Sequence, residues 1–357
     1  MGQLRVLSLA DAQGWCDVLD RFPCCEVAHS PRFARVYEEK GDGKAECLLF
    51  ESNGGRVLYP FIRRPLGALG FVPADLAQLT DIITPYCYGG FVHDAEDGPA
   101  ARNLLVRFRA AFEGYARETG IVSEFVRFHP LLGNHQHCDD LFDAFILHRD
   151  NIVVDLSRSV DDLLGGCRQT VRRYIRRAKE SGRIHVRLEP TPSSAVFQDL
   201  YSRTMDRHGQ RGYLNFQRDY FDILFRNLAD DLLFFTASID GEVVAGALFL
   251  RSGDTLDYFL GGSKEEHFHH HPNHLLFYEC MCWGQRQGLK CLHLGGGRDS
   301  LYYFKTGFSK ETVPFYVGHR IHDPDAYDAL VALRAASPPV LRASGEGFFP
   351  GYRQGFE

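Results

Sequence analysis

The sequence predicts an α/β protein of two tandem domains with the same architecture, each a mixed, largely antiparallel sheet flanked by helices. Two hairpin patterns support this prediction, because each places β-rich segments around an Asn-Gly or Asp-Gly pair, at 53–54 and 240–241. The order of segments after each hairpin is also the same, which indicates a duplication. A chain of 357 residues is long enough for two ordinary cores.

The first copy starts from its hairpin and reaches a further strand through a helix. The hairpin covers 48–64, and we expect Asn53-Gly54 to adopt the positive φ of a tight turn. A strand region, a helix that ends at Gly120 and another strand follow, at 81–94, 99–120 and 121–129. We assign residues 1–150 to this first domain.

The second copy repeats this order, with extra elements ahead of its hairpin. We assign residues 151–322 to it, and 323–357 to a helix and an aromatic tail. The tail is expected to pack back on the body, because its aromatic rings would otherwise be exposed. The elements expected in the second copy are strand 151–157, helix 159–182, strand 184–189, helices 193–208 and 217–228, hairpin 232–251, strand 254–266, helix 273–288 and strand 289–297.

Composition limits the classes of function. With 45% hydrophobic and 24% charged residues, the chain has the balance of a soluble globular protein. It shows no signal peptide and no run of 18 apolar residues, so we expect a cytoplasmic monomer without a membrane span. The ten cysteines include no C-x-x-C pair, so we expect reduced thiols and no zinc ribbon. The net charge of -6 disfavours extensive coating by nucleic acid but leaves room for a local basic patch.

A run of three glycines, Gly295 to Gly297, follows a short apolar strand and precedes Lys305. A Walker loop needs a lysine and a hydroxyl residue directly after its last glycine, and this chain has neither there. A dinucleotide-binding loop needs a glycine where Ser300 stands. Both loops are therefore excluded. The run is either a turn with a surface lysine nearby or the rim of an active site.

Several segments carry a resemblance to a known family. In the second half they are "YFLGGS" at 258–263, "PNHLLFYECMCWGQRQG" at 272–288, and the glycine run followed by "L-x-x-F-K-x-x-F" at 301–308. In the first half, "HSPRFARVY" at 29–37 and "PYCYGG" at 85–90 contribute. Together they resemble the Fem family of aminoacyl-tRNA-dependent peptidyltransferases. That resemblance implies two tandem acyltransferase domains of the GNAT type.

The resemblance also implies a reaction, in which a free amine attacks the ester that joins an amino acid to tRNA. Lys305 is implied to lie beside the ester, with Phe304 next to it, where an ammonium group would stabilise the negative tetrahedral oxygen. The glycines Gly295, Gly296 and Gly297 would let the backbone approach the substrate. No cofactor is implied, because aminoacyl-tRNA is a co-substrate and the acceptor is a small molecule with an amine.

The general base stays open among a carboxylate, a histidine and water. The two carboxylates considered are Asp81, which precedes the "PYCYGG" segment, and Asp257, on the strand before Gly261. Each is at least as well explained by a structural role. Four further residues are candidates for substrate binding: Tyr86, Tyr88, Tyr258 and Arg35.

Two observations favour tRNA over coenzyme A. A GNAT enzyme binds the pyrophosphate of acetyl-CoA on a [QR]-x-x-G-x-[GA] loop, and the corresponding segment here, 261–274, lacks that motif. In addition, six basic residues cluster on a predicted helix whose buried stripe is Val171, Ile175 and Ala178. They form either a tRNA-binding face or an ordinary solvated one. The six are Arg168, Arg172, Arg173, Arg176, Arg177 and Lys179.

A histidine cluster lies in the segment before the helix that starts at Asn273. No acidic or cysteine partner stands at a recognised ligand spacing, and Pro272 interrupts any helix that would present an i,i+4 pair, so we expect no metal. A loop that lines the substrate site, or a polar turn, is expected instead. The cluster consists of His267, His269, His270, His271 and His274.

One departure from the family pattern bears on which acceptor the protein uses. Cell-wall members hold a nucleotide-linked acceptor partly with a lysine, and the matching position here is Tyr37, with Arg35 as the nearest cation. A small soluble acceptor, such as an antibiotic or peptide precursor, therefore fits at least as well as a peptidoglycan precursor. The sequence leaves two more functions open, an acyl-CoA-dependent N-acyltransferase and a non-catalytic binding module.

Overall fold

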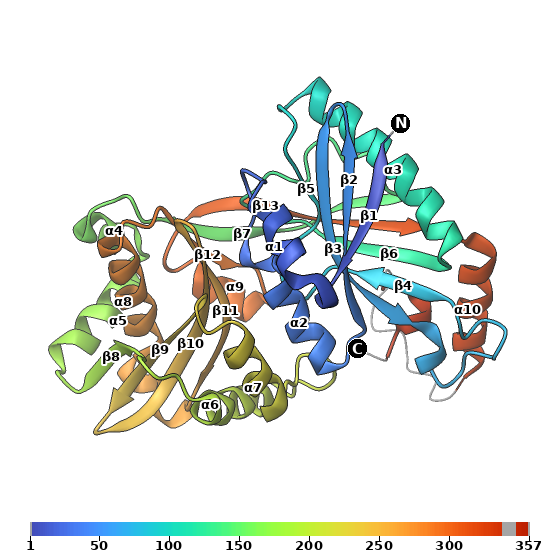
Figure 1. Cartoon of the computed structure of the whole chain (residues 1–357). Coiled ribbons are helices and arrows are strands. Elements are labelled where there is room, and N and C mark those ends of the chain that lie inside the picture. Colours follow the sequence, from blue (N-terminus) through green and yellow to red (C-terminus); the bar gives the residue numbers. More distant parts are fainter. Residues whose placement is uncertain (1, 338–347, 356–357) are drawn as a thin grey trace. The chain divides into compact units, whose positions relative to one another are not determined.

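The computed structural model describes residues 2–337 and 348–355 (Figure 1). Contacts within the chain divide it into two compact units. Unit 1 contains residues 1–148 and 315–357, and unit 2 contains residues 149–314.

Two strands cross the boundary between the units. β7 (Ala144–Asp155) passes from unit 1 into unit 2, and β13 (Glu311–Ile321) passes back into unit 1. Residues 315–322, which the sequence analysis assigned to the second domain, therefore lie in unit 1.

Unit 1 is a mixed sheet with helices packed on it. The strand order is β1-β2-β3-β4-β6-β13, with β5 paired to β3, and only β4 and β6 run parallel among these described pairs. Phe108 and Phe112 of α3 pack edge-on against Tyr59 of β3 in the core. The elements are β1 (Gln3–Ser8), η1 (Leu9–Asp11), α1 (Ala12–Leu19), η2 (Val27–His29), α2 (Pro31–Lys40), β2 (Lys44–Ser52), β3 (Gly55–Pro65), η3 (Leu66–Ala68), β4 (Thr80–Ile83), β5 (Val92–His93), α3 (Pro99–Glu118), β6 (Ile121–Arg127), α10 (Pro324–Ala336) and η5 (Gly351–Arg353).

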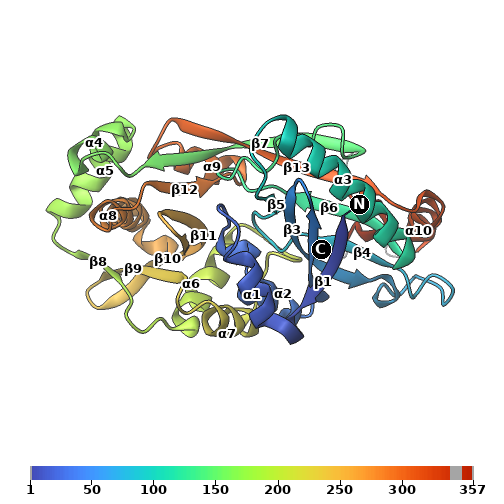
Figure 2. The same ribbon diagram turned by 45° about the horizontal axis from the view of Figure 1, so that its top comes forward.

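Unit 2 has a sheet of strand order β7-β12-β11-β10-β9-β8, in which β11 and β12 run parallel. Figure 2 shows α5 and α8 on one face of this sheet and α6 and α7 on the other. Ile175 of α5 lies in the core of the first face, and Phe197 of α6 packs on Phe234 of β9 on the second. The elements are α4 (Val160–Gly166), α5 (Gln169–Glu180), β8 (Ile184–Leu188), α6 (Ser194–Arg207), α7 (Arg218–Asn227), β9 (Leu232–Ile239), β10 (Glu242–Ser252), β11 (Thr255–Ser263), η4 (Glu265–His270), α8 (Pro272–Arg286), β12 (Cys291–Gly295) and α9 (Asp299–Lys305).

The order of elements confirms the predicted duplication. In unit 1 a hairpin leads through β4 to α3 and β6, and in unit 2 a hairpin leads through β11 to α8 and β12. The strands on either side of the helix are parallel neighbours in both units. Gly120 and Gly288 have positive φ after α3 and α8, as predicted for residues that end a helix.

The two hairpin turns differ in detail. Asp240 and Gly241 both have positive φ, of 51° and 85°, so the second turn is as predicted. The first turn also lies at Asn53-Gly54, because Ser52 pairs with Gly55, but the expected positive φ at that pair was wrong, since the positive φ of 123° falls on Gly55. The second glycine of the pair Gly54-Gly55 thus takes the conformation that only glycine adopts easily.

The helix predicted over 159–182 is in fact two helices, α4 and α5, that are separated at Cys167 and Arg168. Cys167 has an extended ψ of 150°, and the preceding Gly165 and Gly166 are poor helix formers. Arg172 donates hydrogen bonds to the carbonyl oxygens of Gly165 and Cys167 at 2.7 and 2.8 Å. The guanidinium group therefore satisfies carbonyl groups at the end of α4 that the break leaves without helix partners.

The described part of the C-terminal tail packs on unit 1, as predicted. Tyr352 is fully buried, and its hydroxyl group lies 2.6 Å from the hydroxyl of Ser123. Arg353 donates a hydrogen bond of 2.5 Å to Asp81. Residues 338–347 of the same predicted tail lie outside the described residues.

Candidate active site in unit 2

A pocket opens in unit 2 where two parallel strands separate. β12 pairs with β11 over Thr255–Asp257, whereas β11 continues to Ser263. Residues beyond the paired stretch contribute, with α6, η4, α8 and α9, to a pocket of about 380 Å³. No aspartate or glutamate is among the described residues that line it. Its aromatic and imidazole side chains are His208, Tyr258, Phe268, His271, His274, Phe277 and Phe304.

Lys305 is buried at the end of α9, with 4% of its surface exposed. Its Nζ donates a hydrogen bond of 2.6 Å to the carbonyl oxygen of Gly296 and lies 4.9 Å from the ring centroid of Tyr258. The interpretation as a surface lysine is therefore wrong. Phe304 and Tyr258 line the pocket directly, so the ammonium group lies behind one ring of the pocket wall.

The glycine run makes the turn that brings this carbonyl to Lys305. Gly295 and Gly297 have positive φ, of 73° and 116°, which other residues adopt at a cost. A Cβ at Gly296 would lie 2.8 Å from Oδ1 of Asn151, so the backbone is closely packed there. The close neighbour of the run in this structure is Asn151, and none of the three glycines is among the described residues that line the pocket. The predicted approach of the run to a substrate stays a prediction.

Asp257 belongs to a buried polar chain that sequence reasoning did not identify. Its Oδ1 lies 2.6 Å from Nδ1 of His293, and Nε2 of His293 lies 3.0 Å from Nδ2 of Asn151. The two ring nitrogens of His293 therefore join the carboxylate of Asp257 to the side-chain amide of Asn151. His293 has no exposed surface. Its position inside the apolar strand "CLHLGG" was the available signal, since a buried histidine needs a partner.

Two histidines of the cluster line the pocket, as expected for a substrate-lining loop. Burial, together with the nearby His271, lowers the pKa of His274 to about 4, so this ring is neutral at pH 7. Burial also lowers the pKa of His271, with Arg177 as a further cause. His267, His269 and His270 lie in η4, which contributes Phe268 to the pocket instead.

The basic helix α5 carries a groove of about 570 Å³, lined by Arg172, Arg173, Arg176 and Arg177 among others. Val171, Ile175 and Ala178 form its buried stripe, as predicted. Tyr174 of the same helix stacks on His271 of the pocket, with ring centroids 4.0 Å apart. The groove and the pocket are therefore neighbours within unit 2.

The six basic residues predicted to bind tRNA are not equivalent. The guanidinium group of Arg168 donates a hydrogen bond of 2.6 Å to Thr306, and that of Arg172 donates hydrogen bonds to backbone carbonyls. Both side chains therefore stabilise the structure of unit 2. Lys179 forms an ion pair of 2.8 Å with Glu279. Arg173, Arg176 and Arg177 are exposed.

Four of the predicted substrate-binding residues lie in unit 1. Asp81 has a structural role there, because it is fully buried between Arg64 at 2.8 Å and Arg353 at 2.5 Å. Burial alone would raise the pKa of Asp81, but the two arginines outweigh it and lower the pKa. A carboxylate held in this way is a poor proton acceptor, which argues against Asp81 as the base. Tyr86, Tyr88 and Arg35 are half-buried.

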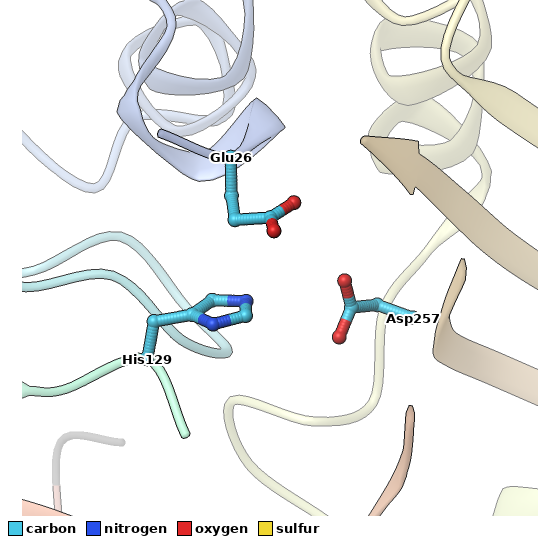
Figure 3. A group of neighbouring side chains, drawn as sticks. All are labelled: Glu26, His129 and Asp257. Carbon is cyan, nitrogen blue, oxygen red and sulfur yellow. The ribbon is translucent and has the colours of Figure 1, made fainter. Parts of the chain in front are cut away.

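A second group of side chains surrounds Tyr88 in unit 1. The ring of Tyr88 lies 6.1 Å from that of His129 in an edge contact, and Tyr37 donates a hydrogen bond of 3.4 Å to the carbonyl of Tyr86. Figure 3 shows His129 facing the carboxylate of Glu26, and their ligand atoms lie within 4.8 Å. Asp257, drawn in the same figure, belongs to unit 2.

Comparison with known proteins identifies the kind of fold. Residues 165–306 match the acetyltransferase (GNAT) domain family. The crystal structure of FemX is similar over 92% of this chain and 99% of that chain, with a TM-score of 0.69 and 14% identity. Among curated proteins, none matches this sequence.

Two other solved structures share the fold. The C-terminal domain of a putative lysylphosphatidylglycerol synthetase from Agrobacterium fabrum has a TM-score of 0.53 and 16% identity, over 94% of this chain and 100% of that chain. L-PGS from Bacillus licheniformis has the same TM-score and identity, over 87% and 92%. The tandem GNAT-like fold predicted from the sequence is thereby confirmed. No helix of the described residues is long and apolar enough to cross a membrane.

Proposed function

Because this chain is a GNAT-type acyltransferase with the fold of FemX, we propose that it transfers an amino acid from aminoacyl-tRNA to the amine of a small soluble acceptor. The product is an amide, and the released tRNA is the second product. The tRNA is a co-substrate, so the reaction needs no cofactor. We place the reaction in the cytoplasm, where charged tRNA is made.

The chemistry starts with the acceptor amine, whose nitrogen bonds to the carbonyl carbon of the aminoacyl ester. The carbonyl oxygen becomes negative, the bond to the ribose oxygen then breaks, and the amine proton ends on the released ribose hydroxyl. An ester is already activated, so the main tasks are to align the amine and to stabilise the negative oxygen. In this proposal Lys305 supplies the positive charge for that oxygen, from a buried position behind Tyr258.

One observation carries the proposal, namely the basic groove of α5 next to the pocket. A charged tRNA combines a polyanion with an aminoacyl ester end that carries no phosphate, and unit 2 offers a separate surface for each part. Arg173, Arg176 and Arg177 suit phosphate groups, since each contact releases counterions. The Tyr174 and His271 stack connects this groove to the pocket that would receive the ester.

The pocket also suggests which donors are favoured. A lysyl donor, of the kind that the name of the Agrobacterium fabrum protein indicates, carries a side-chain ammonium group. An ammonium group taken out of water needs a carboxylate or comparable partner. The described lining of this pocket has no acidic residue and is rich in rings. We therefore propose a donor amino acid whose side chain is uncharged.

The acceptor is proposed to be small and soluble, in preference to a peptidoglycan precursor. At the position where cell-wall relatives are expected to have a phosphate-binding lysine, Tyr37 is fully buried and bonds to the backbone. It cannot contribute a positive charge to a nucleotide-linked acceptor. Arg35 on the same helix is half-buried and is the nearest cation in sequence.

A second candidate, an acyl-CoA-dependent N-acyltransferase, is favoured by the match of residues 165–306 to an acetyltransferase family. Coenzyme A also combines phosphate groups with an acyl end. The two candidates differ in the size of the polyanion, and α5 presents three exposed arginines along one groove, which suits a polyanion larger than a pyrophosphate.

The deciding experiment supplies the full chain with a pool of tRNAs charged with isotopically labelled amino acids and a mixture of small amines. Label in new amides, found by mass spectrometry and absent when the tRNA pool is uncharged, supports the proposal. A parallel reaction receives acetyl-CoA and longer acyl-CoAs in place of tRNA. Product in that arm alone would establish the second candidate, and product in neither arm would favour a non-catalytic binding module.

A further inference from the structure

Tyr303 is an exposed aromatic ring that neither the core nor the pocket accounts for. It is 68% exposed, the highest value among the exposed large hydrophobic side chains of the described residues. It lies on α9, between the pocket-lining residues Leu301 and Phe304. A single exposed ring is common on protein surfaces, so the indication of a ligand comes from its position beside the pocket and from the arginine that contacts it.

The ring of Tyr303 is held in position from one side. The guanidinium carbon of Arg168 lies 4.2 Å from the ring centroid. Arg168 is itself fixed, because its Nη2 donates to Thr306 Oγ1 at 2.6 Å and to the carbonyl oxygen of Tyr303 at 3.4 Å. The arginine therefore covers one face of the ring, and a ring that is already ordered loses little entropy when a flat ligand stacks on it.

Arg168 also connects Tyr303 to the basic groove. It is the residue directly before α5, whose first residue, Gln169, already lines the groove. A second pair of the same kind lines the pocket itself, since Arg207 lies 4.8 Å from the ring centroid of Phe268, which is 38% exposed. The open ring of Tyr303 thus stands between two pocket-lining residues in the sequence of α9, and its arginine stands one residue before the helix that carries the basic groove.

We propose that Tyr303 is a stacking platform for an unpaired nucleobase at the 3′ end of the tRNA. Arginine-backed aromatic rings beside a basic groove bind single-stranded nucleic acid in this way, because every base has a flat face. The inference rests on the proposed function and adds to it the part of the tRNA that unit 2 holds. A base on Tyr303 lets the following nucleoside and its ester enter the pocket.

The test measures binding of fluorescently labelled, uncharged tRNA to the full chain by anisotropy at several salt concentrations. Tyr303→Ala should weaken binding roughly tenfold, and the slope of affinity against salt should not change, because no phosphate contact is lost. Tyr303→Phe keeps the flat ring and should bind like wild type. Val196→Ala, which shortens another exposed apolar side chain of unit 2, is the control.

A tRNA that lacks its unpaired 3′ nucleotides locates the effect. Wild type and Tyr303→Ala should bind this shortened tRNA equally weakly. If the variant binds intact tRNA as tightly as wild type does, or loses the same factor on the shortened tRNA, the platform is wrong while the proposed function stands. If wild type binds no tRNA at all, the proposed function fails as well.

Coenzyme A provides the last arm, because its adenine is also a base linked to phosphates. Excess coenzyme A should leave tRNA bound to wild type. Displacement of tRNA from wild type but not from Tyr303→Ala would mean that the adenine of coenzyme A occupies the ring, and the assignment to RNA would be overturned. Thermal unfolding of each variant checks that unit 2 remains folded.

Discussion

Lys305 is the residue on which the proposed chemistry depends most directly. A buried ammonium group near a developing oxyanion acts in a medium that screens it little. We expect Lys305→Met to lower kcat about 10²- to 10³-fold, with a smaller change in KM for tRNA, because the lost interaction forms in the transition state. The labelled-amide assay measures both constants.

Lys310→Met is the matched control, because Lys310 is exposed and five positions away. It should retain wild-type activity. Thermal unfolding of Lys305→Met separates chemistry from structure, since Nζ also holds the carbonyl of Gly296. A stable Lys305→Met enzyme with wild-type kcat would contradict the role of this residue.

Gly262 illustrates how a single residue sets the approach of a helix to a strand. A Cβ at this position would lie 2.4 Å from the backbone carbon of Leu200 and 2.6 Å from the nitrogen of Tyr201. Backbone atoms of α6 cannot relieve this clash by a rotamer change, as a side chain could. We therefore expect Gly262→Ala to lower the free energy of unfolding by about 2 kcal/mol. Urea unfolding followed by circular dichroism measures the loss.

Gly165→Ala in the same unit is the comparison for this change. Nothing lies within 4 Å of a Cβ at Gly165, which is in α4. Alanine is the better helix former, so this variant should gain about 0.5 to 1 kcal/mol. Equal stabilities of the two variants would show that α6 shifts away from β11 without cost.

At the residue scale, some of the candidate site could be predicted from the sequence and some could not. Lys305 and Phe304 stand in a motif, so the resemblance pointed to them. The structure places Phe304 in the pocket wall and Lys305 behind the pocket-lining ring of Tyr258. For Asp81 the structure supports the structural role that the sequence left open, but its partner could not be predicted, because Arg353 lies 272 positions away in the sequence. The partnership of Asp257 with His293 was missed for the same reason, since strand neighbours need not be sequence neighbours.

At the scale of single elements, helix α5 makes a specific prediction about salt. Arg176 and Arg177 are exposed and line the groove. If they contact tRNA phosphates, the double change Arg176→Ala with Arg177→Ala weakens tRNA binding. It also reduces the slope of log affinity against log salt by about 0.7 to 0.9 for each lost contact. The titration is the same anisotropy measurement at increasing salt.

The control for α5 removes two exposed cations elsewhere in unit 2, Arg218 and Lys290, whose side chains are 59% and 76% exposed. This control variant loses two positive charges, as the α5 variant does, so the long-range attraction to tRNA falls equally in the two variants. A reduced slope in the control as well would mean that α5 has no special part in binding.

The positions of elements were largely predictable, and their ends were less so. The turn at Asp240-Gly241 could be predicted from these two residues alone, because both accept positive φ. The break between α4 and α5 was not predicted, because the apolar period of α5 continues smoothly backward to Leu163 and Leu164. The side chain of Arg172 stabilises the break, because it donates hydrogen bonds to the backbone carbonyls of Gly165 and Cys167.

At the scale of the whole molecule, buried neutral histidines make stability depend on pH. Burial, with the nearby His129 as a further cause, lowers the pKa of His29 to about 3, whereas an unfolded histidine titrates near 6.5. Between these values the unfolded chain binds more protons than the folded one, so stability is full above about pH 6.5 and falls as the pH drops. His274 and His319, both lowered to about 4, act in the same direction.

We expect each of these histidines to remove up to about 2 kcal/mol from the free energy of unfolding between pH 7 and pH 5. Urea unfolding at a series of pH values measures the slope. His29→Gln should lose less stability over this range than wild type. His185→Gln, which replaces an exposed histidine, is the control and should keep the wild-type slope. Parallel slopes for all three proteins would contradict this account.

The tandem organisation was visible in the sequence because a duplicated order survives when its residues have diverged. β13 and the tail come from the end of the chain but pack in unit 1 with segments from its first half. A local stretch of sequence does not contain both partners, so these pairings could not be predicted. Length and periodicity predict which segments are strands. Which distant strand completes a sheet depends on the hydrogen bonds left open at an edge.

The place of β13 in unit 1 has a consequence for synthesis on the ribosome. When residues 1–148 have emerged, β6 still lacks the antiparallel neighbour that Val317 to Ile321 will provide. Residues 149–314 are by then yet to be translated, and they can fold as a unit before that neighbour exists. The unit whose synthesis begins first is therefore completed last, and until β13 arrives its open β6 edge can pair with another strand.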